Sequence, residues 1–395
     1  MNELSPRRRN LHPFPARMAP DIALQKIEEL TSPGDVVLDP MCGSGTVPRL
    51  ALEQDRQAIA CDLDPLAVMM TRTACRTVLS SNLASRAEDM VNRAKRLRRS
   101  IPSWIEQDAA TTEFVNYWFA EQQREQLGRL ARVLADRPTT DDPLRLAMSR
   151  LIITKEGGAS LARDTSHSRP HRVRDDNDFD VYAGFLREAE RIEATVAGLA
   201  NERSVSVRTV DARALKFVPR GSVTLIVTSP PYLNAIDYLR GHRMSLVWLG
   251  WRVDQLREVR GTSIGSERGM RNPPARVSEL AEQAVPRLGE LTPRNRHLVY
   301  RYADDIDRLM RSFARVTRPG GHLVLVVADS QLRGVPVSSS TTCALGAQRA
   351  GFALEEVTTR ELPSKHRYLP PPLANSGAMA SRMDTEVVLS FTRTA

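Results

Sequence analysis

The stretch that decides the expected fold is Asp35-Val-Val-Leu-Asp-Pro-Met-Cys-Gly-Ser-Gly-Thr46. A short apolar run ends at Asp39, the glycine turn Gly43-Ser-Gly45 follows, and a helix is predicted to begin at Thr46. Glycines let a backbone turn sharply and approach a ligand closely, and the start of a helix offers free N–H groups. The stretch therefore predicts a strand, a ligand-binding turn and a helix in succession.

The surrounding residues narrow the class of ligand. The turn lacks both the GxxxxGK(S/T) sequence of a phosphate-binding loop and the third glycine of GxGxxG, which disfavours a pyrophosphate cofactor. Asp62 ends a second apolar run, where a carboxylate can accept hydrogen bonds from both hydroxyls of a ribose. Asp211 ends a third run and is placed to accept from an adenine amino group. Turn formation and helix capping remain open alternatives for each residue taken singly.

Seven apolar runs bounded by turn residues predict the strands of an α/β sheet that is covered on both faces by helices. We expect these strands at 36–39, 58–62, 205–210, 223–228, 322–328, 352–358 and 386–391. About 140 residues separate the second strand from the third, far more than the dozen that a crossover needs. This excess predicts an inserted, mainly helical subdomain.

The resulting organisation has five parts. Residues 1–75 hold the first half of the core, and residues 76–201 form the helical insertion, a candidate DNA-binding or target-recognition subdomain. Within it, apolar spacing predicts helices over 112–135 and 179–199, joined by a mobile loop at 155–178. Residues 202–251 carry the fourth strand, and residues 298–395 complete the core. Glycines and prolines in 252–297 predict a flexible basic loop or lid.

The fourth predicted strand leads directly into Ser229-Pro-Pro-Tyr232. Prolines lack a backbone donor and fix the chain, so carbonyl oxygens are left free to point into a site. The Ser229 oxygen and the Pro230 carbonyl can both accept from an exocyclic NH2 group, while Tyr232 stacks on a flat ring. The turn predicts a site for a planar amine; a rigid strand-to-helix turn is the alternative.

Composition bounds the partners and the location. The 395 residues include 56 Lys and Arg and 47 Asp and Glu, and the net charge of +9 favours a polyanionic partner. Source-genome base composition is an equally open explanation for the many arginines. No apolar run reaches the roughly 20 residues of a membrane span, so a soluble cytoplasmic protein is expected. The four cysteines form no CxxC pair, which favours reduced thiols, and no metal site is expected.

Three motifs carry a resemblance to a known family. Asp39-Pro-Met-Cys-Gly-Ser-Gly-Thr46 followed by Thr228-Ser-Pro-Pro-Tyr232 resembles the S-adenosylmethionine-dependent DNA amino-methyltransferases, which modify N4 of cytosine or N6 of adenine. Leu11-His-Pro-Phe-Pro-Ala-Arg17 is similar to their N-terminal cofactor motif. The resemblance implies a seven-stranded Rossmann-like methyltransferase sheet, S-adenosyl-L-methionine as cofactor, and double-stranded DNA of a prokaryotic nucleoid as substrate. It also suggests a cognate restriction endonuclease as a second partner.

The resemblance assigns roles to individual residues. Phe14 and Arg17 would hold the methionine end of the cofactor, Asp62 its ribose and Asp211 its adenine. Met41, where the family often has phenylalanine, would keep an apolar contact. The full set of expected cofactor residues is His12, Phe14, Arg17, Asp39, Pro40, Met41, Cys42, Gly43, Ser44, Gly45, Thr46, Asp62, Leu63, Asp211 and Ala212. The expected catalytic residues are Ser229, Pro230, Pro231 and Tyr232.

The implied reaction is direct methyl transfer to the amino group of an extruded base. Ser229 in place of aspartate resembles the cytosine-N4 members, so N4 of cytosine is the expected position. An N6-adenine enzyme, an RNA base methyltransferase and an inactive nucleic-acid-binding relative remain as alternatives. Methylation at carbon 5 of cytosine is disfavoured because no Pro-Cys dipeptide supplies a nucleophile. Weaker signals nominate DNA contacts at Arg240, His242, Arg243, Lys365 and Arg367.

Overall fold

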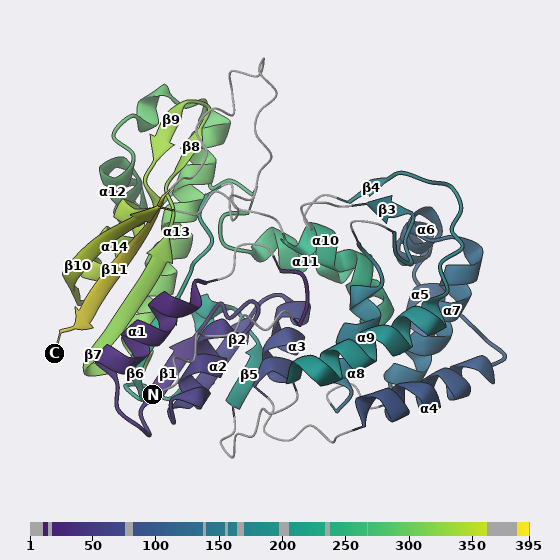
Figure 1. Ribbon diagram of the computed structural model, residues 1–395. Coiled ribbons are helices and arrows are strands. Elements are labelled where there is room, and N and C mark those ends of the chain that lie inside the picture. The colour runs from purple at the N-terminus through teal and green to yellow at the C-terminus, as the bar shows by residue number, and fades with distance from the viewer. Residues whose placement is uncertain are drawn as a thin grey trace.

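A seven-stranded sheet with strand order β10-β11-β7-β6-β1-β2-β5 forms the centre of the computed structural model (Figure 1). The structure describes residues 11–14, 18–75, 82–136, 140–154, 157–163, 170–196, 205–233, 238–266, 268–361 and 385–394. The strands are β1 (Val36–Asp39), β2 (Gln57–Asp62), β5 (Val205–Thr209), β6 (Val223–Thr228), β7 (Thr317–Val327), β10 (Phe352–Glu361) and β11 (Thr385–Arg393). All seven expected strands are therefore present in one sheet, which confirms the predicted seven-stranded α/β class.

Strand β1 lies at the middle of the sheet, parallel to β2 on one side and to β6 on the other. Val37 pairs with Leu225 and Leu38 with Ile226, so β1 and β6 end side by side. Strand β11 runs antiparallel to both β7 and β10. Every residue of β6 is buried, as expected for a parallel strand covered on both faces.

Helices cover both faces of the sheet. Val37 packs into a core with the helices α1 (Pro20–Leu30), α2 (Thr46–Glu53) and α3 (Pro65–Ala74). Its neighbour Leu38 points to the opposite face, because side chains alternate along a strand, and packs with α12 (Ala275–Ala284), α13 (Pro293–Val316) and α14 (Ser339–Arg349). The sheet is thus the middle layer of three.

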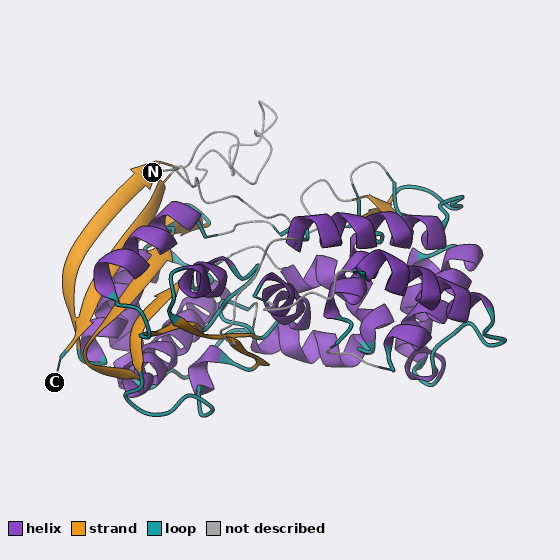
Figure 2. Ribbon diagram, turned by 60° about the horizontal axis from the view of Figure 1, so that its bottom comes forward, coloured by secondary structure: helices purple, strands orange, loops and turns teal. Residues whose placement is uncertain are grey.

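The insertion between β2 and β5 forms a helical half beside the sheet, and Figure 2 shows the long strands confined to the other half. Its elements are α4 (Leu83–Lys95), α5 (Ser103–Glu106), α6 (Ala109–Trp118), α7 (Glu121–Leu134), α8 (Asp142–Arg150), α9 (Val181–Val196) and the hairpin strands β3 (Ala162–Arg163) and β4 (His171–Arg172). One hydrophobic core runs without interruption from α1, α2 and α3 into these helices. The insertion is therefore packed as part of the same body as the sheet.

Two details of the insertion differ from the sequence-based expectation. The single helix expected over 112–135 is divided into α6 and α7, because the backbone of Phe119 between them is extended. The Phe119 ring packs against the Trp248 ring, with 5.2 Å between the ring centroids. The loop expected over 155–178 contains the β3–β4 hairpin, in which Ala162 pairs with Arg172.

The prediction of a flexible loop over 252–297 was wrong. This region holds α11 (Val253–Thr262), α12, the short turn η3 (Leu288–Glu290) and the start of α13. The prolines that suggested a loop precede α12, where Pro274 is the N-cap, and the helix buries Val277 and Leu280. Proline is tolerated before the first turn of a helix, so its presence did not exclude one.

The remaining described elements are α10 (Tyr238–Leu246), the turns η1 (Ala212–Ala214) and η2 (Val247–Leu249), and the strands β8 (Ser330–Leu332) and β9 (Val335–Val337). Helix α10 lies between the sheet and the helical half (Figure 1). Among the described helices, none has both the length and the apolar composition that crossing a bilayer requires.

Candidate functional site

The glycine turn and the Ser-Pro-Pro-Tyr turn lie at neighbouring strand ends. The first follows β1 and the second follows β6, and the two strands are parallel and adjacent. The Thr228 hydroxyl at the end of β6 donates to Asp39 Oδ1 at the end of β1 over 2.8 Å. Thr228 was not singled out from the sequence, although its place at the end of a strand matches that of Asp39. The structure therefore joins two segments that are far apart in the chain.

The backbone of the glycine turn requires glycine at two positions. Gly43 and Gly45 have φ values of +46° and +81°, which residues with a Cβ rarely adopt. A Cβ on Gly45 would lie 2.9 Å from the Cα of Thr71, and one on Gly43 would lie 3.0 Å from the Phe14 ring. The turn is thus held closely between α3 and the N-terminal segment.

Asp62 ends β2 and closes the other side of the glycine turn. Its Oδ2 accepts from the Gly43 N–H at 2.9 Å, and its Oδ1 accepts from the Asp64 N–H at 2.9 Å. Burial and the nearby Asp64 charge raise the pKa of Asp62 to about 6, against the opposing effect of these hydrogen bonds. A carboxylate has about four acceptor positions, so two remain for a ligand.

Asp39 is almost fully buried, with 4% of its surface exposed. Burial raises its pKa to about 7, and the hydrogen bonds from Thr228 and the Met41 N–H only partly oppose that effect. Asp39 therefore connects the two turns through its hydrogen bond with Thr228. Its charge depends on pH near neutrality.

The carboxylate of Asp211 is held by Arg213. The Arg213 Nε donates to Asp211 Oδ1 at 2.9 Å, and its terminal nitrogens contact Asp211, Asp305 of α13 and the Thr262 carbonyl of α11. Hydrogen bonds and charge from Arg213 lower the pKa of Asp211, although burial opposes this. Asp211 keeps 28% of its side chain exposed. Arg213 was not singled out from the sequence, where its only signal was its place two residues after Asp211.

The Ser-Pro-Pro-Tyr turn is half open to solvent. Ser229 is exposed, Pro230 is buried, and Pro231 and Tyr232 are half-buried. The Ser229 hydroxyl donates to the Val326 carbonyl of β7 at 2.7 Å. Because the only hydroxyl proton is committed to Val326, the free lone pairs of the Ser229 oxygen can act as acceptors.

The N-terminal segment is held over the glycine turn by the helical half. His12 Nε2 lies 2.8 Å from the Ser149 hydroxyl of α8, and Arg150 donates to the Leu11 carbonyl at 2.8 Å. These contacts bring Phe14 against Gly43. Arg17, expected beside Phe14, lies outside the described residues.

The other expected cofactor residues occupy the same edge of the sheet. Pro40 and Cys42 are buried and Met41 is half-buried in the segment that leads into the glycine turn. Leu63 follows Asp62, and Ala212 begins η1 directly after Asp211. Ser44 and Thr46 lie at the start of α2, where their hydroxyl oxygens are 3.4 Å apart.

The residues nominated for DNA contact are placed differently. His242 is buried with 4% exposure, and its Nδ1 contacts Asp64, so it does not lie at the surface expected for a phosphate contact. The Arg243 guanidinium lies over the Phe114 ring of α6, 5.1 Å from its centroid. Arg240 is half-buried on the same helix, α10. Lys365 and Arg367 lie outside the described residues.

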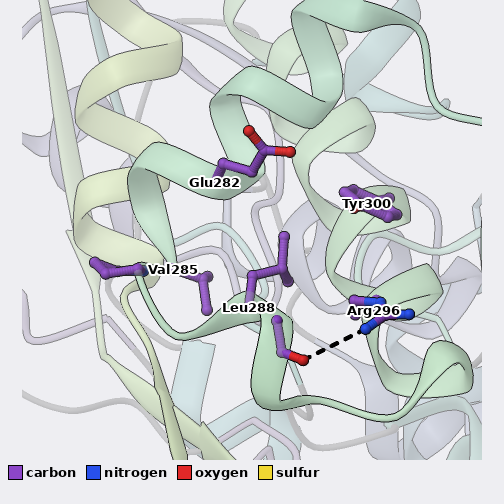
Figure 3. Close-up of a pocket in the computed structure, with 7 residues that line it drawn as sticks. Glu282, Val285, Leu288, Arg296 and Tyr300 are labelled. Atoms are coloured by element: carbon purple, nitrogen blue, oxygen red, sulfur yellow. Dashed lines mark hydrogen bonds between the residues drawn. The ribbon is translucent and has the colours of Figure 1, made fainter.

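A separate cavity of about 480 Å³ lies between α12, η3 and the first turns of α13 (Figure 3). Glu282, Val285, Leu288, Arg296 and Tyr300 line it. Arg296 donates to the Gly289 carbonyl at 3.4 Å, so part of its hydrogen-bonding capacity serves the local turn. Neither the glycine turn nor the Ser-Pro-Pro-Tyr turn contributes to this cavity. In the described part of the chain, no group of three His, Cys, Asp or Glu could hold a metal ion.

Comparison with known proteins points to methyltransferases. Residues 2–72 match a family described as DNA methylase, a segment that includes the glycine turn and Asp62 but not the Ser-Pro-Pro-Tyr turn. No curated protein matches the chain.

Solved structures give more distant likenesses. A proposed DNA modification methylase from Thermus thermophilus is 21% identical over 24% of this chain and 37% of its own, with a TM-score of 0.19. The same protein crystallised with S-adenosyl-L-methionine is 19% identical over 47% of this chain and 54% of its own, with a TM-score of 0.24. A SAM-dependent methyltransferase from Methanosarcina mazei is 9% identical over 96% of this chain and 99% of its own, with a TM-score of 0.35.

Proposed function

We propose that this chain is an S-adenosylmethionine-dependent DNA methyltransferase that acts on the exocyclic amino group of a base, most specifically N4 of cytosine. The observation that carries the proposal is the hydrogen bond of 2.8 Å between Thr228 and Asp39. It joins the turn suited to a nucleoside ligand to the turn suited to a planar amine. The family match over residues 2–72 supports the proposal.

The residues around the glycine turn fit the cofactor. Two acceptor positions of Asp62 are available for the ribose hydroxyls, and the exposed part of the Asp211 side chain, 28% of its surface, is available for the adenine amino group. The Phe14 ring lies against the backbone of Gly43 in the same turn. When bound, S-adenosylmethionine supplies an electrophilic methyl group on a sulfonium, which is a good leaving group.

On the other side of the site, Ser229 and Pro230 act on the amino nitrogen of the base. That nitrogen is conjugated with the ring and is a weak nucleophile. The Ser229 oxygen and the Pro230 carbonyl accept hydrogen bonds from its two N–H groups and draw it toward tetrahedral geometry, which exposes its lone pair. Once the nitrogen carries the methyl group, it releases one of these protons to solvent. Such alignment of reactants contributes about 7 kcal/mol or more to rate acceleration.

The base must leave the duplex to reach this site, because its amino group is otherwise paired. Tyr232 stacks on the extruded ring, and its half-buried side chain leaves part of its surface open for that contact. Ser229, in place of a carboxylate, offers a neutral acceptor, and this favours N4 of cytosine over N6 of adenine in the proposal.

The helical half supplies the proposed DNA-contacting surface. Arg163, His171 and Arg172 of the β3–β4 hairpin are exposed, and Arg172 lies 5.0 Å from the ring centroid of Tyr117. The Tyr117 side chain is 51% exposed. Cationic side chains interleaved with an aromatic ring are typical of nucleic-acid contacts. A further proposed partner of the protein is a cognate restriction endonuclease that recognises the same DNA sequence.

The test combines methyl transfer with product identification. The full chain is incubated with tritium-labelled S-adenosylmethionine and either unmethylated phage λ DNA or transfer RNA, and the modified nucleoside is identified by mass spectrometry. We expect label in DNA only, as N4-methylcytosine. N6-methyladenine would support the adenine alternative, and label in RNA alone would reject the DNA substrate. Absence of transfer to either would favour an inactive nucleic-acid-binding protein.

A further inference from the structure

His242 of α10 is buried at the junction of three segments. Its Nδ1 contacts Asp64 Oδ2, and because a carboxylate only accepts hydrogen bonds, Nδ1 is the donor. Its ring lies 5.7 Å from the Phe14 ring and 6.3 Å from the His12 ring, measured between centroids. One side chain of α10 therefore touches both the loop after β2 and the N-terminal segment.

The Asp64 contact leads directly to Asp62. The Asp64 N–H donates to Asp62 Oδ1 at 2.9 Å, and Asp64 Oδ1 accepts from the Leu66 N–H at the start of α3. The orientation of Asp64 thus sets the position of an N–H group that holds Asp62. A shift of His242 would be transmitted to Asp62 through a single residue.

The Phe14 contact leads to the glycine turn. The Phe14 ring comes so close to Gly43 that a Cβ there would lie 3.0 Å from it. His242 packs against the same ring, with 5.7 Å between the two ring centroids. The imidazole therefore supports the two structures that border the glycine turn, Asp62 through Asp64 and Phe14 directly.

We propose that His242 is a positioning residue that couples the base site to the cofactor site. Helix α10 begins at Tyr238, six positions after Tyr232 of the Ser-Pro-Pro-Tyr turn, so a short stretch of chain connects His242 to the proposed base site. Occupation of either site stabilises the position of α10 that the other site requires. Coupling of this kind is reciprocal, so DNA tightens cofactor binding by the same factor as cofactor tightens DNA binding. This inference rests on the proposed function.

The experiment measures the dissociation constant of S-adenosylhomocysteine by calorimetry, with and without unmethylated phage λ DNA. For the unaltered chain we expect DNA to tighten binding by about 5-fold or more, a usual size for coupling between sites. In His242→Gln the amide donor is displaced from the position of Nδ1, and we expect binding about 10-fold weaker with the DNA effect abolished. In His242→Asn the amide can replace Nδ1, and we expect binding within about 3-fold of the unaltered chain with the DNA effect retained.

The two amides are matched in polarity, so a general loss of folding would affect both alike. His322→Ala is a second control, because His322 lies on β7 near Thr392 and contacts neither turn; its binding should be unchanged. A kinetic readout accompanies these measurements: His242→Gln should raise KM for S-adenosylmethionine and lower kcat together, whereas a structural effect that only lowers the folded fraction leaves KM unchanged.

A double-mutant cycle tests the route through Asp64. In an Asp64→Asn background, which keeps an acceptor for the Leu66 N–H but removes the charge, His242→Gln should weaken binding by about 3-fold or less. Fully additive effects would overturn the route. If the unaltered chain binds S-adenosylhomocysteine with DNA coupling and His242→Gln retains both, the inference fails while the proposed function stands. If the unaltered chain does not bind S-adenosylhomocysteine, both fail.

Discussion

At the scale of single residues, the carboxyl groups at the ends of two strands have strongly shifted pKa values. Asp39 and Asp62 both have raised pKa values because they are buried at the carboxyl edge of the sheet. Asp35, at the opposite end of β1, has a lowered pKa: hydrogen bonds from the Ser32 N–H and the Thr224 hydroxyl outweigh the effect of burial. The two ends of one short strand therefore respond to pH in opposite directions.

The free energy of unfolding of the unaltered chain should fall as the pH rises, because Asp39 must ionise while buried, and Asp39→Asn should not show this fall. The pKa of Asp39 is about 7 in the folded chain and 3.8 is its ordinary value, so the folded state binds the proton more strongly. Stability falls between about pH 4 and pH 7, by at most about 4 kcal/mol, and is constant above. Urea unfolding at pH 5 and pH 8 measures the difference between the two proteins.

Asp35→Asn is the control for this experiment, and its difference in unfolding free energy from the unaltered chain should be the same at pH 5 and at pH 8. Its lowered pKa contributes stability above the ordinary value that is lost as the pH falls below about 4. If Asp39→Asn and the unaltered chain keep the same difference in unfolding free energy at both pH values, the raised pKa of Asp39 is contradicted.

Ser229→Ala and Asp62→Ala should separate the two sides of the proposed site. Ser229→Ala removes one acceptor for the base, so we expect kcat to fall by about 10-fold or more with cofactor affinity within about 2-fold. Tyr232→Ala should behave in the same way. Asp62→Ala should weaken S-adenosylhomocysteine binding by about 10-fold or more. Calorimetry and tritium transfer measure the two quantities, and an equal loss of affinity in all three variants would mean that the roles are misassigned.

At the scale of elements, the glycine turn depends on how closely α2 and α3 pack. Gly45 is the N-cap of α2 and has a left-handed conformation, while α3 passes directly beside it at Thr71. Local chain geometry and tertiary contact thus require glycine at the same position. A substitution there must strain the backbone and push two helices apart.

Gly45→Ala should therefore destabilise the protein more than a glycine substitution that meets no neighbour. Gly34→Ala is the matched control, because Gly34 has a φ of +90° and nothing lies within 4 Å of the added Cβ. We expect about 1–2 kcal/mol of strain for Gly34→Ala and about 3 kcal/mol or more for Gly45→Ala. Thermal and urea unfolding compare the two. An equal decrease in the free energy of unfolding in both variants would show that α3 moves away from the added Cβ without further destabilisation.

At the scale of the whole molecule, the helical half is part of the site as well as a candidate DNA surface. Its helix α8 holds the N-terminal segment through Ser149 and Arg150. Trp104 of α5 donates to the Val247 carbonyl at 2.9 Å, next to α10. The insertion therefore supports Phe14 and α10 from one side, while its β3–β4 hairpin remains exposed.

Arg163→Ala combined with Arg172→Ala should weaken DNA binding without affecting S-adenosylhomocysteine binding. Each lost phosphate contact should reduce the slope of log K against log salt concentration by about 1. Fluorescence anisotropy with labelled λ DNA fragments, between low and physiological salt, measures that slope. Arg287→Ala, an exposed arginine paired with Glu290 beside α12, is the control and should leave the slope unchanged. An unchanged slope in the double variant would place the DNA surface elsewhere.

The chain itself carries enough local information to predict the sheet and the two turns. Apolar runs ending in Asp39, Asp62 and Thr228 predict parallel strands, and parallel strands collect the residues that follow them at one edge. Glycine at positions with positive φ and proline after a strand act through their own backbone, so they can be recognised without knowledge of the fold.

Only the tertiary structure decided which polar side chains meet. His242 and Asp64 are 178 positions apart in the chain, and nothing in the local sequence distinguishes a buried histidine from a phosphate contact on an exposed helix face. Arg213 likewise binds Asp305 from 92 positions away. Local patterns encode backbone conformation, whereas the partner of a buried charge is determined by packing between elements that the chain order does not reveal.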